Sequence, residues 1–393
     1  MRWERDGESG SVGVKLLINV NAAWFLISHR LEIARAARDA GYEVHVAADV
    51  ESSAEKEQLE GEGFQFHRMR INRGGVNALR DLVYLRQLGR LMKEIRPDLV
   101  HNVTVKPIVY GTIAARWTGV SGIVNAVSGL GYAFAGKGSR RVVSFLVKSA
   151  YRTALNSPDV KVIFQNNDDR KVFENAGIVD SRQTVLIRGS GVDLGTFAFV
   201  REPEGVPVIV LPARMLRDKG VAEFVEAARL LRGQGCSAKF VLAGKVDHGN
   251  PASLREEELR QFEREVGVEW LGHVTDMTAL YRRAHVVCLP SYREGLPKAL
   301  LEACAVGRAI VATDVPGCRE VVRHGENGFL VEARSARALA AALDVLLQNG
   351  ELRRKMGAAG RKIAENEFDV RSVVRATLDV YERVISESAR RSA

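Results

Sequence analysis

The chain has 393 residues, of which 46% are apolar and 27% are charged, and it contains 36 glycines, 10 prolines and 4 cysteines. This composition excludes a disordered chain, a collagen-like fibre and a disulfide-stapled miniprotein, because enough apolar mass is present to bury a large core. A single core stops growing at roughly 250–300 residues, so we expect two domains of ordinary size.

The charge is positive and unevenly distributed. The formal net charge is +9, and the stretch between Asp98 and Asp159 carries several basic residues but no acidic one. Nucleic acid and an anionic membrane surface are the two partners that such a stretch attracts. No recognised nucleic-acid-binding module or basic-aromatic platform accompanies the charge, so we expect no nucleic-acid partner.

The ends and the cysteines indicate a cytoplasmic protein. Residues 1–13 are polar and glycine-rich and lack the apolar core of a secretory signal, so we expect a disordered tail. No run of about 18 apolar residues without charges is present, so no membrane-spanning helix is expected. The four cysteines have no close C-x-x-C spacing, which argues against both a disulfide framework and a zinc site.

In the first half, apolar runs alternate with amphipathic stretches. Strand, helix and strand joined by short links are typical of a parallel sheet, which we place in residues 14–188. The expected strands are 14–20, 43–48, 64–67, 98–103, 122–126, 161–164 and 184–187, and the expected helices are 26–40, 79–94 and 110–117.

The pattern breaks at residues 189–206, which are rich in glycine and show no period, so we predict an interdomain hinge there. A second α/β series follows in residues 207–367, and a helical apolar stripe predicts one long helix in residues 368–393. The expected strands of the second series are 207–212, 238–243, 268–271, 286–289 and 309–313, and its helices are 221–231, 277–284, 297–306 and 335–347. The predicted fold class is α/β, with two doubly wound parallel sheets in tandem.

The most informative motif follows the strand 286–289, and ligands of open parallel sheets bind at the carboxyl ends of strands. Pro297 suits the first position of a helix, which would leave the N–H groups of Gly295 and Leu296 at its N-terminus as an anion site. Glu294 in the loop and Glu302 about two turns along the helix would both point into one cleft. A sugar nucleotide has both phosphates and hydroxyls to satisfy such a set. The alternative is that Glu302 faces solvent and Glu294 caps the helix.

A second motif follows the strand 207–212. Arg214 at the strand end and Lys219 at the next helix start suit a diphosphate, because Arg binds oxygens bidentately and Lys supplies a point charge. The alternative is a solvated basic turn. Both motifs lie at carboxyl ends of the same predicted sheet.

Together these residues resemble retaining glycosyltransferases of family four, which have the two-domain GT-B fold. Glu294 and Glu302 look like the E-x7-E signature of that family, and Arg214-x4-Lys219-Gly220 looks like its diphosphate clamp. Thr313 to Gly317 resembles a downstream landmark. The resemblance covers nearly the whole chain, from Val14 to about Ile385.

The resemblance implies a role for each matching residue. Glu294 would hydrogen-bond the donor sugar, Glu302 would hold the ribose hydroxyls, and Arg214 and Lys219 would stabilise the diphosphate leaving group. The backbone near Val274 would contact the nucleotide base. It also implies an N-terminal acceptor-binding domain, a C-terminal domain for the nucleotide sugar, a terminal helix that crosses back, and no obligatory metal or other cofactor.

The first half differs from the common family pattern. Asn21-Ala22-Ala23 stands where many relatives have a Gly-Gly pair, and Val127-Ser128-Gly129 stands where many have a histidine. These features resemble the bacterial branch that builds capsule, O-antigen and other lipid-linked oligosaccharides.

The basic stretch is similar to an interfacial helix attracted to anionic lipid. A helix that starts at Ser139 would carry Arg141, Lys148 and Arg152 on one face, with Lys137 just ahead of it. An ordinary solvated helix face is the alternative.

We therefore expect a retaining hexosyltransferase that moves a hexose or N-acetylhexosamine from a nucleotide-diphosphate donor, UDP being favoured, to a polyprenyl-diphosphate-linked saccharide at the inner face of the cell membrane. A nucleotide-sugar 2-epimerase of the same architecture and a non-catalytic sugar-nucleotide-binding protein are the alternatives.

Overall fold

The computed structural model describes residues 13–71, 77–130 and 140–392, and the side chains of these except 140–143 and 392. Nearly all of the expected N-terminal tail lies outside the described residues. The chain divides into two units. Unit 1 runs up to Ser190 and resumes at Val373, and unit 2 comprises Gly191 to Ser372.

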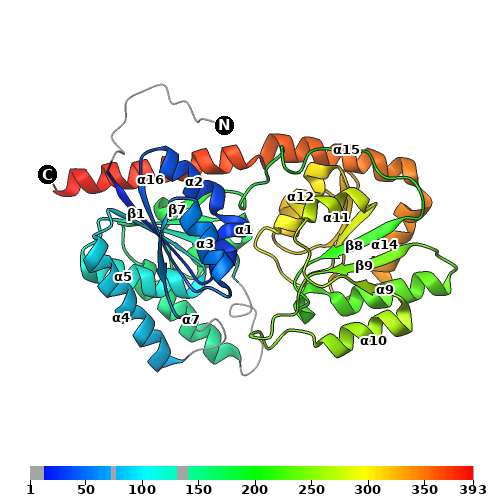
Figure 1. Cartoon of the computed structure of the whole chain (residues 1–393), viewed down its shortest axis with the longest axis horizontal. Coiled ribbons are helices and arrows are strands. Elements are labelled where there is room, and N and C mark those ends of the chain that lie inside the picture. Colours follow the sequence, from blue (N-terminus) through cyan, green and yellow to red (C-terminus); the bar gives the residue numbers. More distant parts are fainter. Residues whose placement is uncertain (1–12, 72–76, 131–139, 393) are drawn as a thin grey trace. The chain divides into compact units, whose positions relative to one another are not determined.

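Unit 1 is a parallel seven-stranded sheet in the order β3-β2-β1-β4-β5-β6-β7 with helices packed against it (Figure 1). Its central strands are buried along their whole length, which explains why they read as continuous apolar runs. The strands are β1 Lys15–Val20, β2 Glu43–Ala48, β3 Gln65–Arg68, β4 Leu99–Val103, β5 Gly122–Val127, β6 Val160–Phe164 and β7 Thr184–Leu186. The helices are α1 Ala23–His29, α2 Leu31–Asp39, α3 Ser53–Gly61, α4 Ala78–Ile95, the π-helix η1 Pro107–Gly111, α5 Thr112–Thr118, α7 Arg140–Leu155, α8 Asn167–Asn175 and the 3-10 helix η2 Ser181–Gln183.

Three asparagines form a ladder across the centre of this sheet. Asn19 of β1, Asn102 of β4 and Asn125 of β5 are in register with one another and fully buried. Asn19 Nδ2 donates to Asn102 Oδ1 (2.9 Å), and Asn102 Nδ2 donates to Asn125 Oδ1 (3.1 Å). Tyr84 OH and Thr112 Oγ1 donate to the two ends of the ladder. The ladder lies beside the point where the strand order reverses, between β1 and β4.

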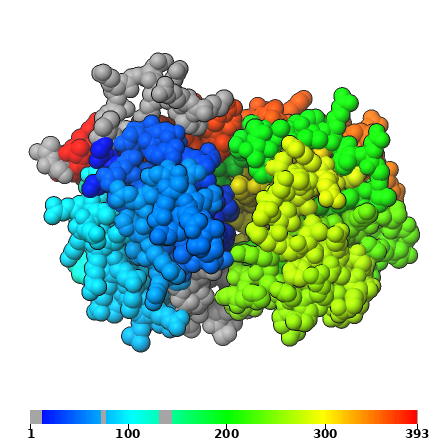
Figure 2. All heavy atoms as spheres, viewed as in Figure 1, coloured from blue at the N-terminus to red at the C-terminus, as the bar shows by residue number. Residues whose placement is uncertain are grey.

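Unit 2 repeats the plan with a six-stranded parallel sheet in the order β10-β9-β8-β11-β12-β13. The strand order reverses between β8 and β11. The strands are β8 Val208–Pro212, β9 Lys239–Ala243, β10 Glu269–Trp270, β11 Val286–Leu289, β12 Ala309–Thr313 and β13 Gly328–Val331. The helices are the 3-10 helix η3 Arg217–Lys219, α9 Val221–Gly233, α10 Glu256–Val266, α11 Met277–Arg283, α12 Lys298–Val306, α13 Cys318–Val321, α14 Ala336–Gln348 and α15 Gly350–Glu367. Segments from α10 to α12, yellow-green to yellow, form much of the face of unit 2 seen in Figure 2.

The last helix, α16 Val370–Ser392, begins in unit 2 and continues in unit 1. In unit 1 its Tyr381 OH forms a hydrogen bond with Nδ1 of His101, which is buried in β4. Glu387 of the same helix pairs with Lys161 of β6 at 3.3 Å. Among the described residues, no helix is both long and apolar enough to cross a lipid bilayer.

Two predicted helices of unit 1 are built differently. The helix expected over 26–40 is two helices that meet at Arg30, whose backbone leaves the helical region (φ −133°, ψ 0°). The amphipathic period runs through this break because Arg30 N–H still donates to Leu26 O (2.8 Å) and Ala34 N–H to Arg30 O (3.0 Å). The helix expected over 110–117 begins earlier, as the π-helix η1. Its Gly111 leaves no room for a Cβ, which would lie 2.0 Å from Asn102 Oδ1.

The predicted hinge segment, 189–206, is divided between the units after Ser190. From Gly191 onward it is held on unit 2. Val192 N–H donates to Phe368 O (2.8 Å), and Val200 N–H donates to Val306 O (3.2 Å).

Candidate active site

Four loops lie side by side at the carboxyl edge of the unit 2 sheet, because their strands are neighbours in the order β9-β8-β11-β12. They are residues 213–220 after β8, 244–255 after β9, 290–297 after β11 and 314–317 after β12. Both motifs singled out in the sequence belong to this set. This edge is the candidate active site.

Two glycines allow these loops to touch. Gly220 has a left-handed backbone (φ +72°), and a Cβ there would lie 2.1 Å from Pro290 O of the β11 loop. Gly317 (φ +80°) packs in the same way, with a Cβ position 2.5 Å from Gly295 O. Any other residue at either position would be strained and would push the loops apart. The β8 and β12 loops therefore both pack against the loop that carries Glu294.

Lys219 and Glu294 meet across this contact. Lys219 ends η3 and Glu294 lies in the β11 loop, and Lys219 Nζ is 2.5 Å from Glu294 Oε1. Their side chains are only 19% and 10% exposed. The alternative in which Glu294 merely caps a helix is not supported, since its carboxylate pairs with an ammonium group. A partly buried ion pair of this kind sets a fixed charge pattern at the site.

Arg214 makes a different contact. It follows β8, and its Nη1 lies 2.6 Å from Oδ2 of Asp247 in the β9 loop. The Arg214 side chain is 41% exposed, whereas that of Asp247 is 18% exposed. Asp247 was not among the predicted site residues, although it stands four residues after the end of β9 and the other candidates also follow strands. Applying the strand-end rule to β9 would have found it.

Glu302 is buried in α12, so the alternative in which it faces solvent is wrong. Tyr281 OH of α11 donates to its Oε2 (3.0 Å), and Lys298 Nζ lies 3.3 Å from its Oε1. Burial raises the pKa of Glu302, and this rise is opposed by the charge of Lys298 and by the two hydrogen bonds. The carboxylate is thus held by its own helix and by the neighbouring one.

The helix start differs from the prediction. Pro297 precedes the helix as its N-cap with an extended backbone (φ −75°, ψ 113°), so α12 begins at Lys298. The helix therefore starts one residue later than predicted, and Gly295 and Leu296 lie in the loop before it. The side chain of Leu296 is buried in the core. Val274 lies after β10 and packs partly buried against the same core.

Tyr292 of the β11 loop makes three contacts that hold this loop in place. Tyr292 OH donates to Glu223 Oε1 of α9 (2.6 Å), and the guanidinium carbon of Arg334 lies 4.5 Å from the centre of the Tyr292 ring. Tyr292 N–H also donates to Asp218 O (2.8 Å), which ties this loop to the one that carries Lys219. No sequence motif pointed to Arg334, which lies three residues after the end of β13.

The amino-acid sequence matches two family models, Glycosyl transferase 4-like over residues 15–166 and Glycosyl transferases group 1 over residues 196–363. It is 30% identical over 348 residues to the glycosyltransferase EpsD of Bacillus subtilis, covering 85% of this chain and 87% of that protein. The chain belongs to the group 1 glycosyltransferases.

Two further likenesses describe this glycosyltransferase. It is 27% identical over 370 residues, 91% of this chain and 95% of the other, to the N,N'-diacetylbacillosaminyl-diphospho-undecaprenol alpha-1,3-N-acetylgalactosaminyltransferase of Campylobacter jejuni. The crystal structure of Anabaena Alr3699/HepE in complex with UDP and glucose superposes with a TM-score of 0.75 at 20% identity, covering 94% of this chain and all of that one. The predicted GT-B fold is confirmed.

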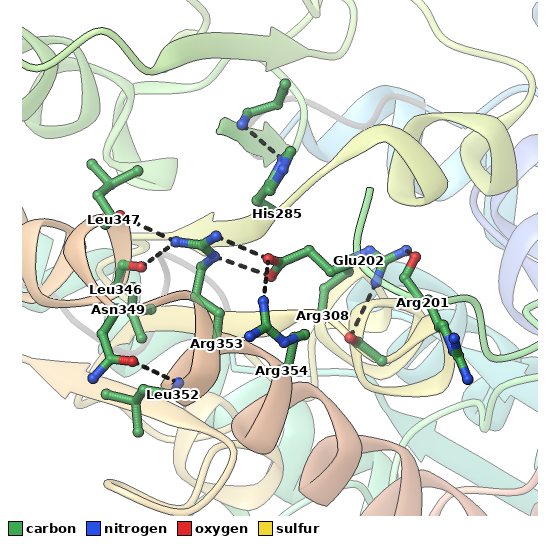
Figure 3. A network of polar contacts seen from close by, with 12 residues as sticks. Arg201, Glu202, His285, Arg308, Leu346, Leu347, Asn349, Leu352, Arg353 and Arg354 are labelled. Atoms are coloured by element: carbon green, nitrogen blue, oxygen red, sulfur yellow. Dashed lines mark hydrogen bonds and ion pairs between the residues drawn. The ribbon is translucent and has the colours of Figure 1, made fainter. Parts of the chain in front are cut away.

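Unit 2 of the glycosyltransferase also has a cavity of about 550 Å³ away from this edge. It lies where strands begin, since His285 precedes β11 and Gly307 stands just before β12. Figure 3 shows the guanidinium of Arg353 between the carboxylate of Glu202 and the carbonyls of Leu346 and Leu347. Arg353 Nε and Nη2 lie 3.0 and 2.9 Å from the two Glu202 oxygens.

A second buried cation, Arg308, precedes β12 directly and is also hydrogen-bonded. Arg308 is 1% exposed and donates to the carbonyls of Tyr281 and Val200, each at 2.9 Å. The buried charges of the cavity thus fasten the segment that enters β8 to the unit, and we assign them a structural role.

The residues expected to face a membrane are only partly described. Lys137 and the side chain of Arg141 lie outside the described residues. Arg152 donates to the carbonyls of Ala176 and Gly177 after α8, so part of its charge is used within unit 1. Beside Lys148, the α7 side chains of Phe145 and Leu146 are 69% and 54% exposed.

Proposed function

We propose that this glycosyltransferase transfers a hexose or N-acetylhexosamine from a UDP-sugar to a saccharide carried on a polyprenyl diphosphate, with retention of anomeric configuration, during synthesis of a bacterial surface polysaccharide or glycan. The Campylobacter relative supports the acceptor class, because its name specifies a diphospho-undecaprenol saccharide. The Anabaena structure, with UDP bound, supports the donor class.

The observation that carries the proposal is the pairing of Lys219 with Glu294 at 2.5 Å. Arg214 precedes Lys219 by five residues in the same loop. Cleavage of the bond between the anomeric carbon and phosphate leaves an oxocarbenium-like sugar and a diphosphate with more negative charge. Arg214 and Lys219 would stabilise that diphosphate. Glu294, anchored by Lys219, would hydrogen-bond the donor sugar beside it.

Glu302 and the backbone near Val274 would hold the nucleoside. Glu302 accepts a hydrogen bond from Tyr281 and contacts Lys298, so the ribose hydroxyls would meet a carboxylate whose orientation is fixed. The amides of Gly295 and Leu296 would complete the phosphate site. The cations of the protein supply the positive charge, so we propose that no metal or other cofactor is obligatory.

In the proposed reaction the acceptor hydroxyl attacks the anomeric carbon from the side of the leaving group. A bond forms between that oxygen and the anomeric carbon as the bond from this carbon to the phosphate oxygen breaks. The hydroxyl proton passes to an oxygen of the departing diphosphate. This course retains the configuration without a protein nucleophile.

We also propose that unit 1 meets an anionic membrane at the inner face of the cell membrane through Lys137, Arg141, Lys148 and Arg152. The exposed apolar side chains of Phe145 and Leu146 on the same helix support this, because basic and apolar side chains together favour the headgroup region of a bilayer. Binding to phosphatidylglycerol vesicles in sedimentation should weaken at high salt and should weaken again in Phe145→Ser/Leu146→Ser. Equal binding to neutral vesicles would contradict the electrostatic part.

The test of function uses the purified full-length chain. A panel of UDP-, GDP- and ADP-sugars is screened for thermal stabilisation, and the stabilising donor is incubated with a polyprenyl-diphosphate-linked saccharide. Transfer with retained configuration, read by NMR of the product, supports the proposal. Conversion of the nucleotide sugar to its 2-epimer without acceptor would favour an epimerase, and donor binding without any turnover would favour a non-catalytic protein.

A further inference from the structure

Asp247 is more than a neighbour of Arg214. Its carboxylate is the more buried partner of the pair, and the Arg214 guanidinium lies on it at 2.6 Å with 41% of the arginine side chain still exposed. An arginine has many rotamers, and a buried carboxylate selects few of them. One nitrogen, Nη1, donates to Asp247 Oδ2, so this contact restricts the rotamers that the guanidinium can adopt.

The two residues are mounted on loops that are joined by backbone hydrogen bonds. Met215 N–H donates to Lys245 O (3.1 Å), Leu254 N–H to Met215 O (2.8 Å) and Arg217 N–H to Ala252 O (2.8 Å). Residues 245–254 therefore follow the β8 loop along its length. These bonds hold the two loop backbones together next to Arg214 and Asp247.

Asp247 is itself fixed by its own loop. Its N–H donates to Ser253 Oγ (2.9 Å), and its carbonyl accepts from Asn250 N–H (2.8 Å). Ser253 N–H in turn donates to Asn250 O (2.9 Å), which closes the turn. This level of backbone restraint is typical of a loop that holds one side chain in place.

The arrangement repeats what the site does with its other cation, since Lys219 is held by Glu294 as Arg214 is held by Asp247. We propose that Asp247 is a positioning residue for Arg214, orienting its guanidinium toward the diphosphate of the donor. This inference rests on the proposed function. Prearranged cations bind a diphosphate more tightly and lower the barrier to its departure, because no rotamer search accompanies binding.

The experiment is a double-mutant cycle with Arg214→Ala, Asp247→Ala and the combined variant. Calorimetry measures the dissociation constants of UDP and GDP, of inorganic pyrophosphate and of uridine for each protein. We expect Asp247→Ala to weaken diphosphate and pyrophosphate binding about tenfold while leaving uridine binding unchanged. In the Arg214→Ala background the same change should have less than about a twofold effect, because the residue it positions is gone. Asp247→Glu should restore part of the affinity.

Glu258→Gln is the matched control. It removes another carboxylate–guanidinium contact of the same loop, Arg217 Nη2 to Glu258 Oε1 at 2.6 Å, without touching Arg214. We expect it to leave diphosphate binding within about twofold of the wild type. Additive effects in the cycle, tighter binding by Asp247→Ala, or equal losses for uridine would overturn the positioning role. If the wild-type protein binds neither UDP nor GDP, the proposed function and this inference both fall.

Discussion

The carboxyl edges of the two sheets differ in chemistry although the sheets share a plan. In unit 1 the strand ends beside the reversal point carry a neutral network, in which Asn19, Asn102 and Asn125 bond to one another in register. In unit 2 the loops that follow β8, β9 and β11 carry ion pairs, Lys219 with Glu294 and Arg214 with Asp247. The same sheet plan can thus carry a neutral or a charged network at its carboxyl edge. The side chains at that edge decide which ligand it suits.

The two networks differ in how accessible their polar groups are to a ligand. The amides of the ladder are fully buried and bond among themselves, so they define the sheet rather than face a ligand. The ion pairs of unit 2 are partly exposed, so an anionic ligand can approach their cations. We therefore expect changes at the unit 2 edge to act on turnover and changes at the ladder to act on stability.

The largest effect is expected at the unit 2 edge. Lys219→Met and Glu294→Gln should each lower kcat/KM of sugar transfer by about 10²–10³, since each removes a group proposed to act on the leaving group or the sugar. Each change also leaves a partly buried charge without its partner, so the melting temperature should fall, but the loss of kcat/KM should persist at a temperature where the variant is fully folded. Steady-state kinetics with the stabilising donor measures the first quantity and calorimetric melting the second. The exposed pair of Lys56 and Glu60 on α3 offers the control, because Lys56→Ala should leave transfer unchanged.

Transfer at wild-type rate by both variants would remove the site from this edge. If the loss of transfer merely matched the loss of folded protein, Lys219 and Glu294 would have a structural role, as the asparagine ladder of unit 1 does. The contrast between the two edges would then not hold.

Much of the fold was predictable because buried parallel strands are continuous apolar runs. The predicted bounds of β2, β11 and β12 agree with the structure. The helix expected from residue 335 is α14, whose N-cap Ser335 accepts from Ala338 N–H at 3.2 Å. The helix break at Arg30 was missed because the apolar period and two main-chain bonds continue through it.

The site was predictable where one short segment carries several residues. Glu294 and Lys219 follow strands directly and belong to recognisable spacings, and the structure brings them together. The role of Asp247 depends on two loops from different strands lying side by side, and the asparagine ladder depends on the register of three strands. Neither juxtaposition is encoded in local spacing, so local patterns alone do not reveal it.

The next largest effect is expected at the amino edge of unit 2. Glu202→Gln should lower the free energy of unfolding by about 3 kcal/mol, because it leaves Arg353 buried without its counter-ion. Urea denaturation followed by circular dichroism measures the change. The double variant Glu202→Gln/Arg353→Met should recover part of the loss, since no buried charge remains unpaired. Equal stability of the single variant and the wild type would show that the cavity charges do not fasten the segment.

The ladder of unit 1 should come next. Asn102→Ala removes the acceptor of Asn19 Nδ2 and the donor to Asn125 Oδ1, and leaving buried amide groups unpaired costs about 2–3 kcal/mol. Donor affinity in calorimetry should stay within about twofold. Asn156→Ala, at an exposed position of the same unit, should have almost no effect on either quantity. Loss of donor affinity with unchanged stability would reverse the roles assigned to the two edges.

The smallest effect concerns pH and again separates the neutral unit 1 core from the charged edge of unit 2. Burial, and secondarily the charge of Arg30, lower the pKa of His101 from 6.5 to about 3. Below about pH 6.5 the unfolded chain therefore binds a proton at His101 that the folded protein does not bind. His101 thus lowers stability as the pH falls. The loss is about 1.4 kcal/mol per pH unit, or about 2 kcal/mol at pH 5.

His101→Gln removes that titration, whatever it does to stability at neutral pH. The difference in unfolding free energy between variant and wild type should therefore shift by about 2 kcal/mol in favour of the variant between pH 7 and pH 5. The other histidines with lowered pKa values, His45, His67 and His285, contribute equally to both proteins and cancel. Urea denaturation at several pH values gives the slope. Parallel pH profiles would mean that His101 binds its proton in the folded protein as readily as in the unfolded chain. The unit 1 core at α16 would then accommodate a charge, as the unit 2 edge does.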